Sequence, residues 1–597
     1  MSQTPFQFTP RIIRSPLADF NGNDIESSPQ AYTDEYLKNI STMGYNGIWL
    51  HGELRTLVPT NLFPRVGAKK IALLRDLVKR AGRFGIKVYF YILEPRALRA
   101  EDSFWKKHPQ LKGQPFILEN VGEFSGTYYS LCTGTAEVKE YLEGGLYTLF
   151  KTVPGLGGIF CITASEFHTH CYSHYPKRDR KHSIKEFNDW ARADFVCPRC
   201  AERSPVEVTA EVIELLNRGV KRANPKADVI AWTWSWSILE DDPQKELIGR
   251  LPKDVILMSD WERGGSKKVC GKTFIVDEYS LSMPGPSPRY KKQLALAKRR
   301  GMRMMAKLQF GATHELAAVP YLPLPHLLAK KFEGLRKHKV DGYLACWIFG
   351  GEVSPMTRLA GLMSQKKCVC AADAVDQVAR ETFGEQSAGA VVRAWKKFAQ
   401  AWQEYPFSIP FLYYGPMNYA TAYPLSLDMK KVPLIPGWLE LPRDKKGHLA
   451  VGDNLDGWID PFTPTLLVRA FTALRKKWDE GVAILEKATQ GDSENRSLKL
   501  EWNLAKHISL VVASTMNIVR FYPLYRKYRQ AKKADEKAKL LKQIRKLFEN
   551  ELENVIQDRE LVKFDSRLGY HAEAYCNLYT LDDFDYKIQR LKSILRK

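Results

Sequence analysis

The chain of 597 residues is 44% hydrophobic and 12% aromatic, and its formal net charge is +23. This length predicts about two to four domains, and so large an apolar share excludes an intrinsically disordered protein. The positive charge favours a polyanionic partner, such as nucleic acid, anionic lipid or an acidic polysaccharide. The densest basic stretch, residues 525–546, is however typical of a solvated helix face. Because no nucleic-acid-binding motif accompanies the charge, we do not expect a nucleic-acid partner.

The N-terminal sequence and the cysteines indicate a reducing compartment. The first residues, MSQTPFQFTPRIIRSPL, lack the apolar run of a signal peptide, and no apolar stretch of about 18 residues predicts a membrane span. The 10 cysteines are mostly scattered. We therefore expect a cytoplasmic protein without a membrane partner, in which clustered cysteines bind metal rather than form disulfides. A removed leader or unconventional export is the alternative.

Eight short apolar runs alternate with longer segments of helical period over the first 360 residues. The runs cover residues 11–20, 46–50, 87–93, 158–163, 228–234, 255–258, 303–308 and 342–348. Their nearly continuous apolar character is typical of parallel strands buried on both faces. Eight strand-helix units predict an α/β fold, a (β/α)8 TIM barrel. The alternative is a doubly wound open sheet, which is disfavoured because no glycine-rich nucleotide motif follows the first strand.

The pattern changes to long helical segments after about residue 365. These segments cover residues 374–405, 463–490, 498–531 and 534–557. We therefore predict a barrel domain over residues 1–365, with a zinc-knuckle insertion at about 168–202, and a mainly α-helical C-terminal domain over 366–597.

Carboxylates, indoles, arginine and histidine follow the predicted strands, where the active sites of such barrels lie. This mixture suits a sugar site, which needs carboxyls for proton transfer, rings for stacking and polar groups for hydroxyls. The predicted substrate-binding residues are His51, Glu94, Arg96, Trp234, Trp236, Gln309, Glu315 and Trp347. The spacing of Trp232, Trp234 and Trp236 predicts that all three indoles face one way, as a substrate platform or as barrel core. Glu94 and Arg96 are predicted to orient the site as an ion pair or to form a plain salt bridge.

Glu166 is the predicted acid catalyst. The run GGIFCITASE leads an apolar strand directly into this carboxylate, and partial desolvation raises the pKa of such a group. The alternative is a carboxylate that caps the following helix. For the second carboxylate, Glu278 in TFIVDEYSLS ranks first, followed by Asp260 and Glu262 and then Glu315, each with a structural or solvated role as the alternative.

A second group of residues predicts a structural zinc site. Two chelating pairs with two intervening residues, separated by about twenty residues, match a zinc knuckle. The predicted ligands are Cys171, His174, Cys197 and Cys200. His168 and His170 are alternative fourth ligands, and free buried thiols are the alternative to a metal. The site would hold the loop that carries Glu166.

Over roughly residues 10–360 the chain resembles family 20 glycoside hydrolases, the β-N-acetylhexosaminidases and their uncharacterised bacterial relatives. The matching segments are YNGIWLHGELR, IFCITASEFHTHC and the tryptophan-rich fifth strand. The family places an Asp-Glu pair at the end of strand four, in which Glu is the acid and Asp orients the substrate acetamido group. The resemblance implies that Glu166 is the acid, whereas Ser165 stands where the family has Asp. The helical region, with ETFGEQ, Trp395 and YYGPMNYATAYPL, is similar to that of α-glucuronidase-type enzymes.

The sequence therefore predicts hydrolysis of a glycosidic bond in an oligosaccharide or glycoconjugate, on an acidic or amino-sugar glycan. Glu166 protonates the leaving oxygen and a second carboxylate acts as nucleophile or as base for water. One alternative is substrate-assisted hexosaminidase action, with Ser165, Asp260 or Glu278 in place of the missing Asp. The other is a non-catalytic glycan- or nucleic-acid-binding protein on the same barrel; two carboxyls within about 5–10 Å favour the enzyme.

Overall fold

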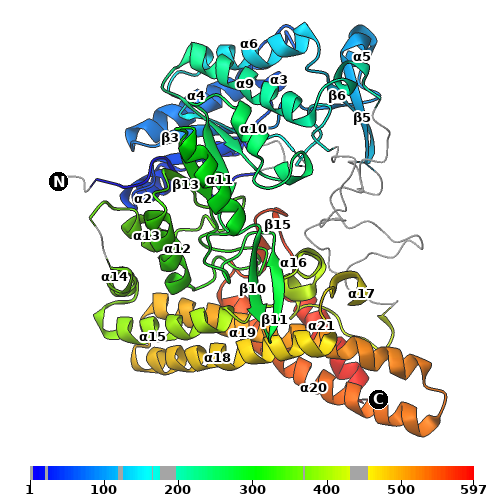
Figure 1. The fold of residues 1–597 in the computed structure, drawn as a ribbon. Coiled ribbons are helices and arrows are strands. Elements are labelled where there is room, and N and C mark those ends of the chain that lie inside the picture. Colours follow the sequence, from blue (N-terminus) through cyan, green and yellow to red (C-terminus); the bar gives the residue numbers. More distant parts are fainter. Residues whose placement is uncertain are drawn as a thin grey trace.

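The computed structural model describes residues 5–19, 24–118, 125–164, 166–174, 196–367, 370–429 and 455–596 (Figure 1). Eight parallel strands close into a barrel in the order β1-β13-β12-β9-β8-β7-β3-β2. The strands are β1 (Arg11–Ile13), β2 (Gly47–His51), β3 (Lys87–Ile92), β7 (Gly158–Ile162), β8 (Asp228–Trp232), β9 (Ile256–Asp260), β12 (Met304–Lys307) and β13 (Gly342–Leu344). Each falls within or beside one of the eight predicted runs, so the predicted TIM barrel is confirmed.

Helices surround the barrel because each buries one apolar face against the strands. They are α1 (Ser28–Ala31), α2 (Asp34–Thr42), α3 (Leu54–Leu57), α4 (Ala68–Arg83), α6 (Ala136–Thr152), α9 (Pro205–Ala223), α10 (Lys245–Arg250), α11 (Pro288–Arg299), α12 (Pro325–Lys337) and α13 (Pro355–Met363). Helix α9 illustrates why the sequence starts a helix where it does. Ser204 and Glu207 form a reciprocal capping box at its start, and Pro205 occupies the first turn.

Insertions enlarge the loops at the C-terminal ends of the strands, which we call the rim. Between β3 and α6 lie α5 (Phe104–Lys107), the short 3-10 turn Pro109–Leu111 and a sheet of order β4-β6-β5, formed by β4 (Leu98–Arg99), β5 (Lys112–Leu118) and β6 (Gly126–Leu131). Helix α8 (Pro198–Ala201) lies between β7 and α9, and the 3-10 turn Trp236–Ile238 follows β8. The hairpin of β10 (Gly265–Val269) and β11 (Lys272–Val276) follows β9.

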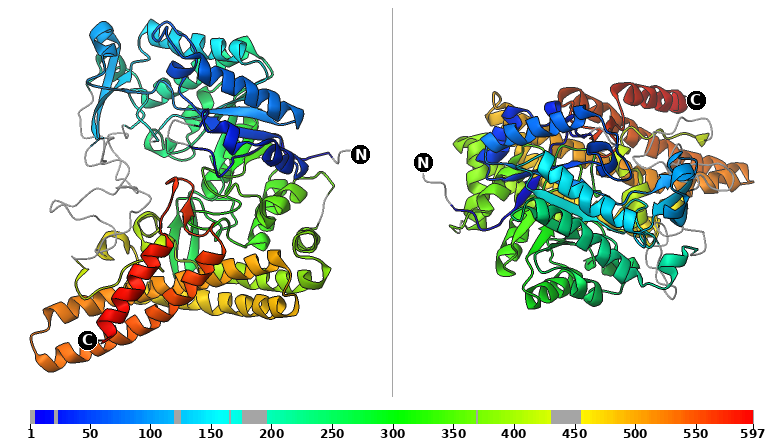
Figure 2. Two further views of the ribbon diagram at one scale, coloured as in Figure 1. Left: turned by 180° about the vertical axis from the view of Figure 1, so that it is seen from behind. Right: turned by 90° about the horizontal axis from the view of Figure 1, so that it is seen from above.

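The chain beyond α13 is mainly helical, as predicted. Its elements are α14 (Ala371–Phe383), α15 (Glu385–Trp402), α16 (Ile409–Tyr414), the 3-10 turn Pro416–Tyr419, α17 (Leu455–Trp458), α18 (Pro464–Gly491), α19 (Arg496–Gln530), α20 (Ala534–Phe564), β14 (Tyr570–His571), β15 (Cys576–Asn577) and α21 (Leu581–Arg596). The long helices α18, α19 and α20 lie together on one side of the barrel (Figures 1 and 2). None of the described helices is long and apolar enough to cross a membrane.

The helical region contacts the rim directly. The side chain of Asn418 accepts a hydrogen bond from the backbone N–H of Ala317, in the loop after β12, at 2.8 Å. The hairpin β14–β15 also reaches the barrel, because the Tyr575 hydroxyl donates to the carbonyl of Ala18 at 2.5 Å and Ala572 joins the apolar cluster inside the barrel. The rim is therefore enclosed by residues from both ends of the chain.

Candidate active site

Glu166 lies in the loop after β7, at the rim. No side chain in the described ranges hydrogen-bonds its carboxyl group, and the residue is partly buried. Burial and, to a lesser extent, the negative charge of Glu278 raise the pKa of Glu166 to about 7 against the opposing charge of the Arg263 guanidinium. A carboxyl that keeps its proton near neutral pH has the protonation state that a general acid requires.

Glu278 lies after β11 and is fully buried. Its Oε2 accepts a hydrogen bond from the hydroxyl of Tyr413 at 2.6 Å, and its Oε1 accepts one from the backbone N–H of Tyr279 at 2.8 Å. Burial raises the pKa of Glu278 to about 7, although the Arg263 charge and these two donors lower it. The structure therefore brings the first-ranked predicted pair, Glu166 and Glu278, into one electrostatic environment.

Asp260 and Glu262, the next-ranked carboxylates, are both buried but differ in their partners. The indole Nε1 of Trp232 donates to Asp260 at 3.3 Å, and burial raises the pKa of Asp260 against the opposing charge of Arg263. Glu262 forms an ion pair with Lys331, and both side chains are inaccessible to solvent. Asp260 therefore contacts the Trp232 indole and Arg263, whereas Glu262 is held in a fully buried ion pair.

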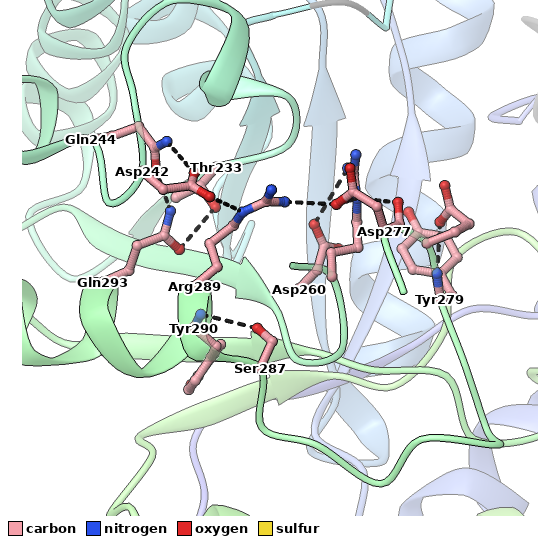
Figure 3. A network of polar contacts seen from close by, with 12 residues as sticks. Thr233, Asp242, Gln244, Asp260, Asp277, Tyr279, Ser287, Arg289, Tyr290 and Gln293 are labelled. Carbon is pink, nitrogen blue, oxygen red and sulfur yellow. Dashed lines mark hydrogen bonds and ion pairs between the residues drawn. The ribbon is translucent and has the colours of Figure 1, made fainter. Parts of the chain in front are cut away.

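A polar network fixes the segment that precedes Glu278 (Figure 3). Arg289 donates to Asp242 at 2.8 Å and to Asp277 at 2.9 Å, and so connects the loop after β8 to the residue before Glu278. Arg263 lies between carboxylates, 3.6 Å from Asp277 and 3.8 Å from Asp260. These ion pairs fix the position of Arg263, whose positive charge opposes the rise in the pKa of both Glu166 and Glu278.

Lys307, at the end of β12, is buried beneath the site. Its ammonium lies 3.1 Å from the centre of the Tyr279 ring and donates to Gln309 Oε1 at 2.8 Å. Burial lowers the pKa of Lys307 to about 7, while the charges of Asp260, Glu262 and Glu278 oppose the shift. The predicted ligand Gln309 also accepts from the Trp347 N–H at 2.6 Å, so its amide oxygen is used within the protein.

Sequence analysis missed a third carboxylate, Glu573, in the hairpin segment between β14 and β15. Its Oε2 is buried and has no hydrogen-bond partner among the described residues. Burial raises the pKa of Glu573 well above its ordinary value, and the charges of Glu166 and Glu278 raise it further. The sequence HAEAYC has no strand pattern or motif, so only the fold reveals that this residue joins the pair.

The three tryptophans after β8 do not face one way, so that prediction was wrong. The strand ends at Trp232, and the period of two ends with it. Trp234 is partly buried, with the Arg263 guanidinium 3.8 Å from its ring centre. Trp236, in the 3-10 turn, is buried outside the barrel and donates to the Thr163 hydroxyl at 2.9 Å. Trp347 stacks on another indole inside the barrel, at a centroid distance of 4.9 Å.

Glu94 accepts a hydrogen bond from the backbone N–H of Arg96 at 3.1 Å, but the Arg96 guanidinium forms its ion pair elsewhere. The buried Glu94 carboxylate accepts hydrogen bonds from the Leu54 N–H at 2.7 Å and the Tyr141 hydroxyl at 3.0 Å. Arg96 pairs with a different carboxylate, Glu53, at 2.5 Å, and its guanidinium lies 3.9 Å from the centre of the Phe167 ring. Arg96 therefore borders the loop that carries Glu166.

Two other predicted ligands are buried at the rim. The ring of His51, at the end of β2, lies 5.4 Å from that of Tyr91. Glu315 is fully buried and accepts hydrogen bonds from several groups. These donors are the Ser280 hydroxyl at 2.6 Å, the Trp402 indole at 2.8 Å, and the Leu281 and Ser282 N–H groups at 3.1 and 3.2 Å. This arrangement links the segments after β11 and β12 to helix α15 and leaves the carboxylate engaged within the protein.

The predicted metal ligands are partly brought together. Cys171, Cys197 and Cys200 meet, but the fourth side chain of the cluster is Cys132 and not His174. The imidazole of His174 lies 4.5 Å from the ring of Phe116 instead. The other two histidines bond to backbone, since His168 contacts the Gln114 carbonyl at 3.1 Å and His170 the Thr163 carbonyl at 2.8 Å. Ser165, the substitute for Asp in the family 20 pair, lies outside the described residues.

Comparison with known proteins identifies the architecture. No sequence family matches the chain, and no curated protein sequence matches it. Among solved structures, a GH138 enzyme targeting pectin rhamnogalacturonan II is similar with a TM-score of 0.56 and 12% identity, over 99% of this chain and 67% of that one. An O-GlcNAc hydrolase mutant from Thermobaculum terrenum gives a TM-score of 0.40 and 11% identity, over 99% of this chain and 95% of that one. At such identity the GH138 similarity shows the fold, a barrel with a C-terminal helical region.

Proposed function

We propose that this protein is a glycoside hydrolase with Glu166 as its general acid. One observation carries the proposal: two carboxyls at the rim of a TIM barrel, Glu166 and Glu278, both have a pKa raised to about 7, and the charge of Glu278 contributes to the rise at Glu166. Hydrolysis of a glycosidic bond requires two carboxyls, one that delivers a proton and one that acts as an anion.

The difference in hydrogen bonding assigns the two roles. Tyr413 and the Tyr279 N–H both donate to Glu278, and such donors stabilise the ionised carboxylate. Glu166 has no comparable donor in the described part of the chain, so we assign the acid role to Glu166 and the anionic role to Glu278. Ionised Glu278 then serves as nucleophile or as base for water, and Glu166 protonates the leaving oxygen.

The surroundings of the pair favour an anionic glycan as substrate. The chain has a net charge of +23, and the guanidinium of Arg96 borders the Glu166 loop. A uronic acid or another acidic sugar would be attracted to this field. The partly buried indole of Trp234, beside Arg263, offers a ring face to the C–H groups of a sugar.

Substrate-assisted hydrolysis is the alternative within the same reaction class. There the attacking group is the substrate's acetamide, and Glu278 or Asp260 would orient it. Tyr413 would then hold Glu278 in place for that purpose. A substrate that carries an N-acetyl group would be required, which makes the alternative separable by experiment.

The test is a screen of chromogenic glycosides that includes neutral, uronic and N-acetylamino sugars, together with pectic oligosaccharides. We expect turnover of an acidic glycoside by the wild-type protein and a large loss in Glu166→Gln, which preserves shape but cannot donate the proton. Activity on N-acetylamino sugars alone would favour the substrate-assisted alternative. Binding without turnover across the panel would contradict the proposal and favour a glycan-binding protein.

A further inference from the structure

Four cysteine side chains from separate segments meet beside the Glu166 loop. Cys132 follows β6, Cys171 lies in the loop after β7, and Cys197 and Cys200 lie at the start of α8. All four are buried, and their sulfur atoms lie within 4.8 Å of one another. We propose that these four thiolates bind one zinc ion and that this ion connects the β3–α6 insertion to the loop carrying Glu166.

The spacing of the sulfurs fits a metal and not a disulfide. Cys132 Sγ lies 3.6 Å from the sulfurs of both Cys197 and Cys200. A tetrahedral zinc with Zn–S bonds of about 2.3 Å places its sulfur ligands about 3.8 Å apart. A disulfide requires an S–S distance of about 2.05 Å, much shorter than that observed. Four sulfurs within 4.8 Å of one another leave room for one small cation between them.

Hydrogen-bond donors surround the sulfurs as they would surround thiolates. Cys171 Sγ accepts from the Gln114 N–H and the Ser130 hydroxyl, each at 3.4 Å. Cys132 Sγ accepts from the Gly134 N–H at 3.4 Å and the Arg199 guanidinium at 3.3 Å. Four thiolates around a divalent cation carry a net negative charge, which these donors and the arginine offset. Neutral thiols would need no such shell.

The position of His174 supports an all-sulfur ligand set. Its ring lies against Phe116, and the hydroxyl of Ser173 contacts its Nδ1 at 3.2 Å. Cys132 supplies the fourth sulfur from a strand end far away in the sequence. With four protein ligands a zinc site is closed, and such a site is structural rather than catalytic.

The ion would brace the segments that position Glu166. Gln114 joins them too, because its side-chain oxygen accepts from the N–H groups of Val196 and Cys197 at 2.7 and 3.2 Å. The same loop is tied to the β3 end by the Ala97 N–H, which donates to the carbonyl of His168 at 2.9 Å. We therefore expect loss of the metal to lower the free energy of unfolding. Any effect on turnover rests on the function proposed above, so metal content and optical spectra form the primary test.

The first experiment measures metal on the intact protein, purified without chelator or added zinc. Elemental analysis should give about one zinc per chain. In thiol titration, the protein should show four more reactive thiols after a chelator is added under denaturing conditions than before. Replacement of zinc by cobalt(II) should give the intense thiolate-to-cobalt charge-transfer bands of an all-sulfur tetrahedral site. A metal-free protein with either free thiols or disulfides at these positions would overturn the proposal.

A second experiment separates the two ligand sets. Cys132→Ser should lose the zinc and abolish the cobalt spectrum, whereas His174→Ala should keep both. Cys370→Ser, which removes an exposed thiol outside the cluster, is the matched control and should behave as wild type. Zinc retained in Cys132→Ser and lost in His174→Ala would show that the knuckle set binds the metal and would refute the assignment.

Discussion

Two carboxylates at the rim, Glu166 and Glu315, have opposite surroundings. Glu315 accepts hydrogen bonds from a hydroxyl, an indole and two backbone N–H groups. Glu166 accepts none from a described side chain, and burial raises its pKa to about 7. Several donors fix a buried carboxylate in one place, whereas burial without donors raises the pKa of a carboxyl group. We therefore expect a structural role for Glu315 and proton transfer by Glu166.

The helical region supplies donors selectively to this rim. Trp402 from α15 bonds Glu315, and Tyr413 from α16 bonds Glu278. No residue of these helices hydrogen-bonds Glu166 in the described structure. The C-terminal region therefore gives Glu315 and Glu278 hydrogen-bond donors that Glu166 does not receive from it.

The largest expected effect follows from removing the proton donor. Glu166→Gln should lower kcat by about 10²–10⁴-fold, the usual contribution of general acid catalysis, with the fold intact. Steady-state kinetics on the best glycoside from the screen, with circular dichroism as the folding check, measure it. The loss should shrink for substrates with good leaving groups such as nitrophenols, which need little protonation. Near-normal turnover of a natural glycan by Glu166→Gln would show that Glu166 is not the general acid.

For Glu315 we expect an effect on stability rather than on turnover. Glu315→Gln places an amide N–H₂ against groups that donate, so it should destabilise the protein by about 1–3 kcal/mol. Chemical denaturation of the wild type, Glu315→Gln and Glu166→Gln compares the three free energies of unfolding. The chemical step should change far less in Glu315→Gln than in Glu166→Gln. If Glu315→Gln left stability unchanged but abolished turnover, the structural role would be wrong.

The smallest effect is expected at Glu573. Burial and the charges of Glu166 and Glu278 raise its pKa well above the ordinary value, which favours its neutral form. Glu573→Gln resembles this neutral state and should leave turnover near neutral pH almost unchanged. Glu573→Lys introduces a cation and should lower the pKa of Glu166, which shifts the alkaline limb of the pH-rate profile to lower pH. A profile that is unchanged in Glu573→Lys would place Glu573 away from the pair.

The sequence predicted the features that depend on local pattern. All eight barrel strands followed from apolar runs, and Glu166 was singled out because it comes just after one of them; its catalytic role, like that of Glu278, stays a prediction. Cys132 and Glu573 could not be found this way, because each reaches its site from a distant segment. The Trp236 prediction failed because the strand ends at Trp232, where a 3-10 turn replaces the period of two. The places of Cys132, Glu573 and Trp236 depend on tertiary contacts and not on residue spacing along the chain.

The most direct test measures the protonation of Glu166 itself, without a substrate. Carboxyl ¹³C NMR of labelled protein, with Glu166→Gln to identify the resonance, gives its titration midpoint. We predict a midpoint near pH 7, well above the ordinary value of 4.5, so that the acid form predominates at lower pH and acid-dependent turnover is lost as pH rises through about 7. The same group then favours the folded state below about pH 4.5, and this contribution disappears as pH rises through the folded-state pKa. A midpoint near 4.5 would contradict the account, because Glu166 would then be an anion at neutral pH and could not deliver a proton.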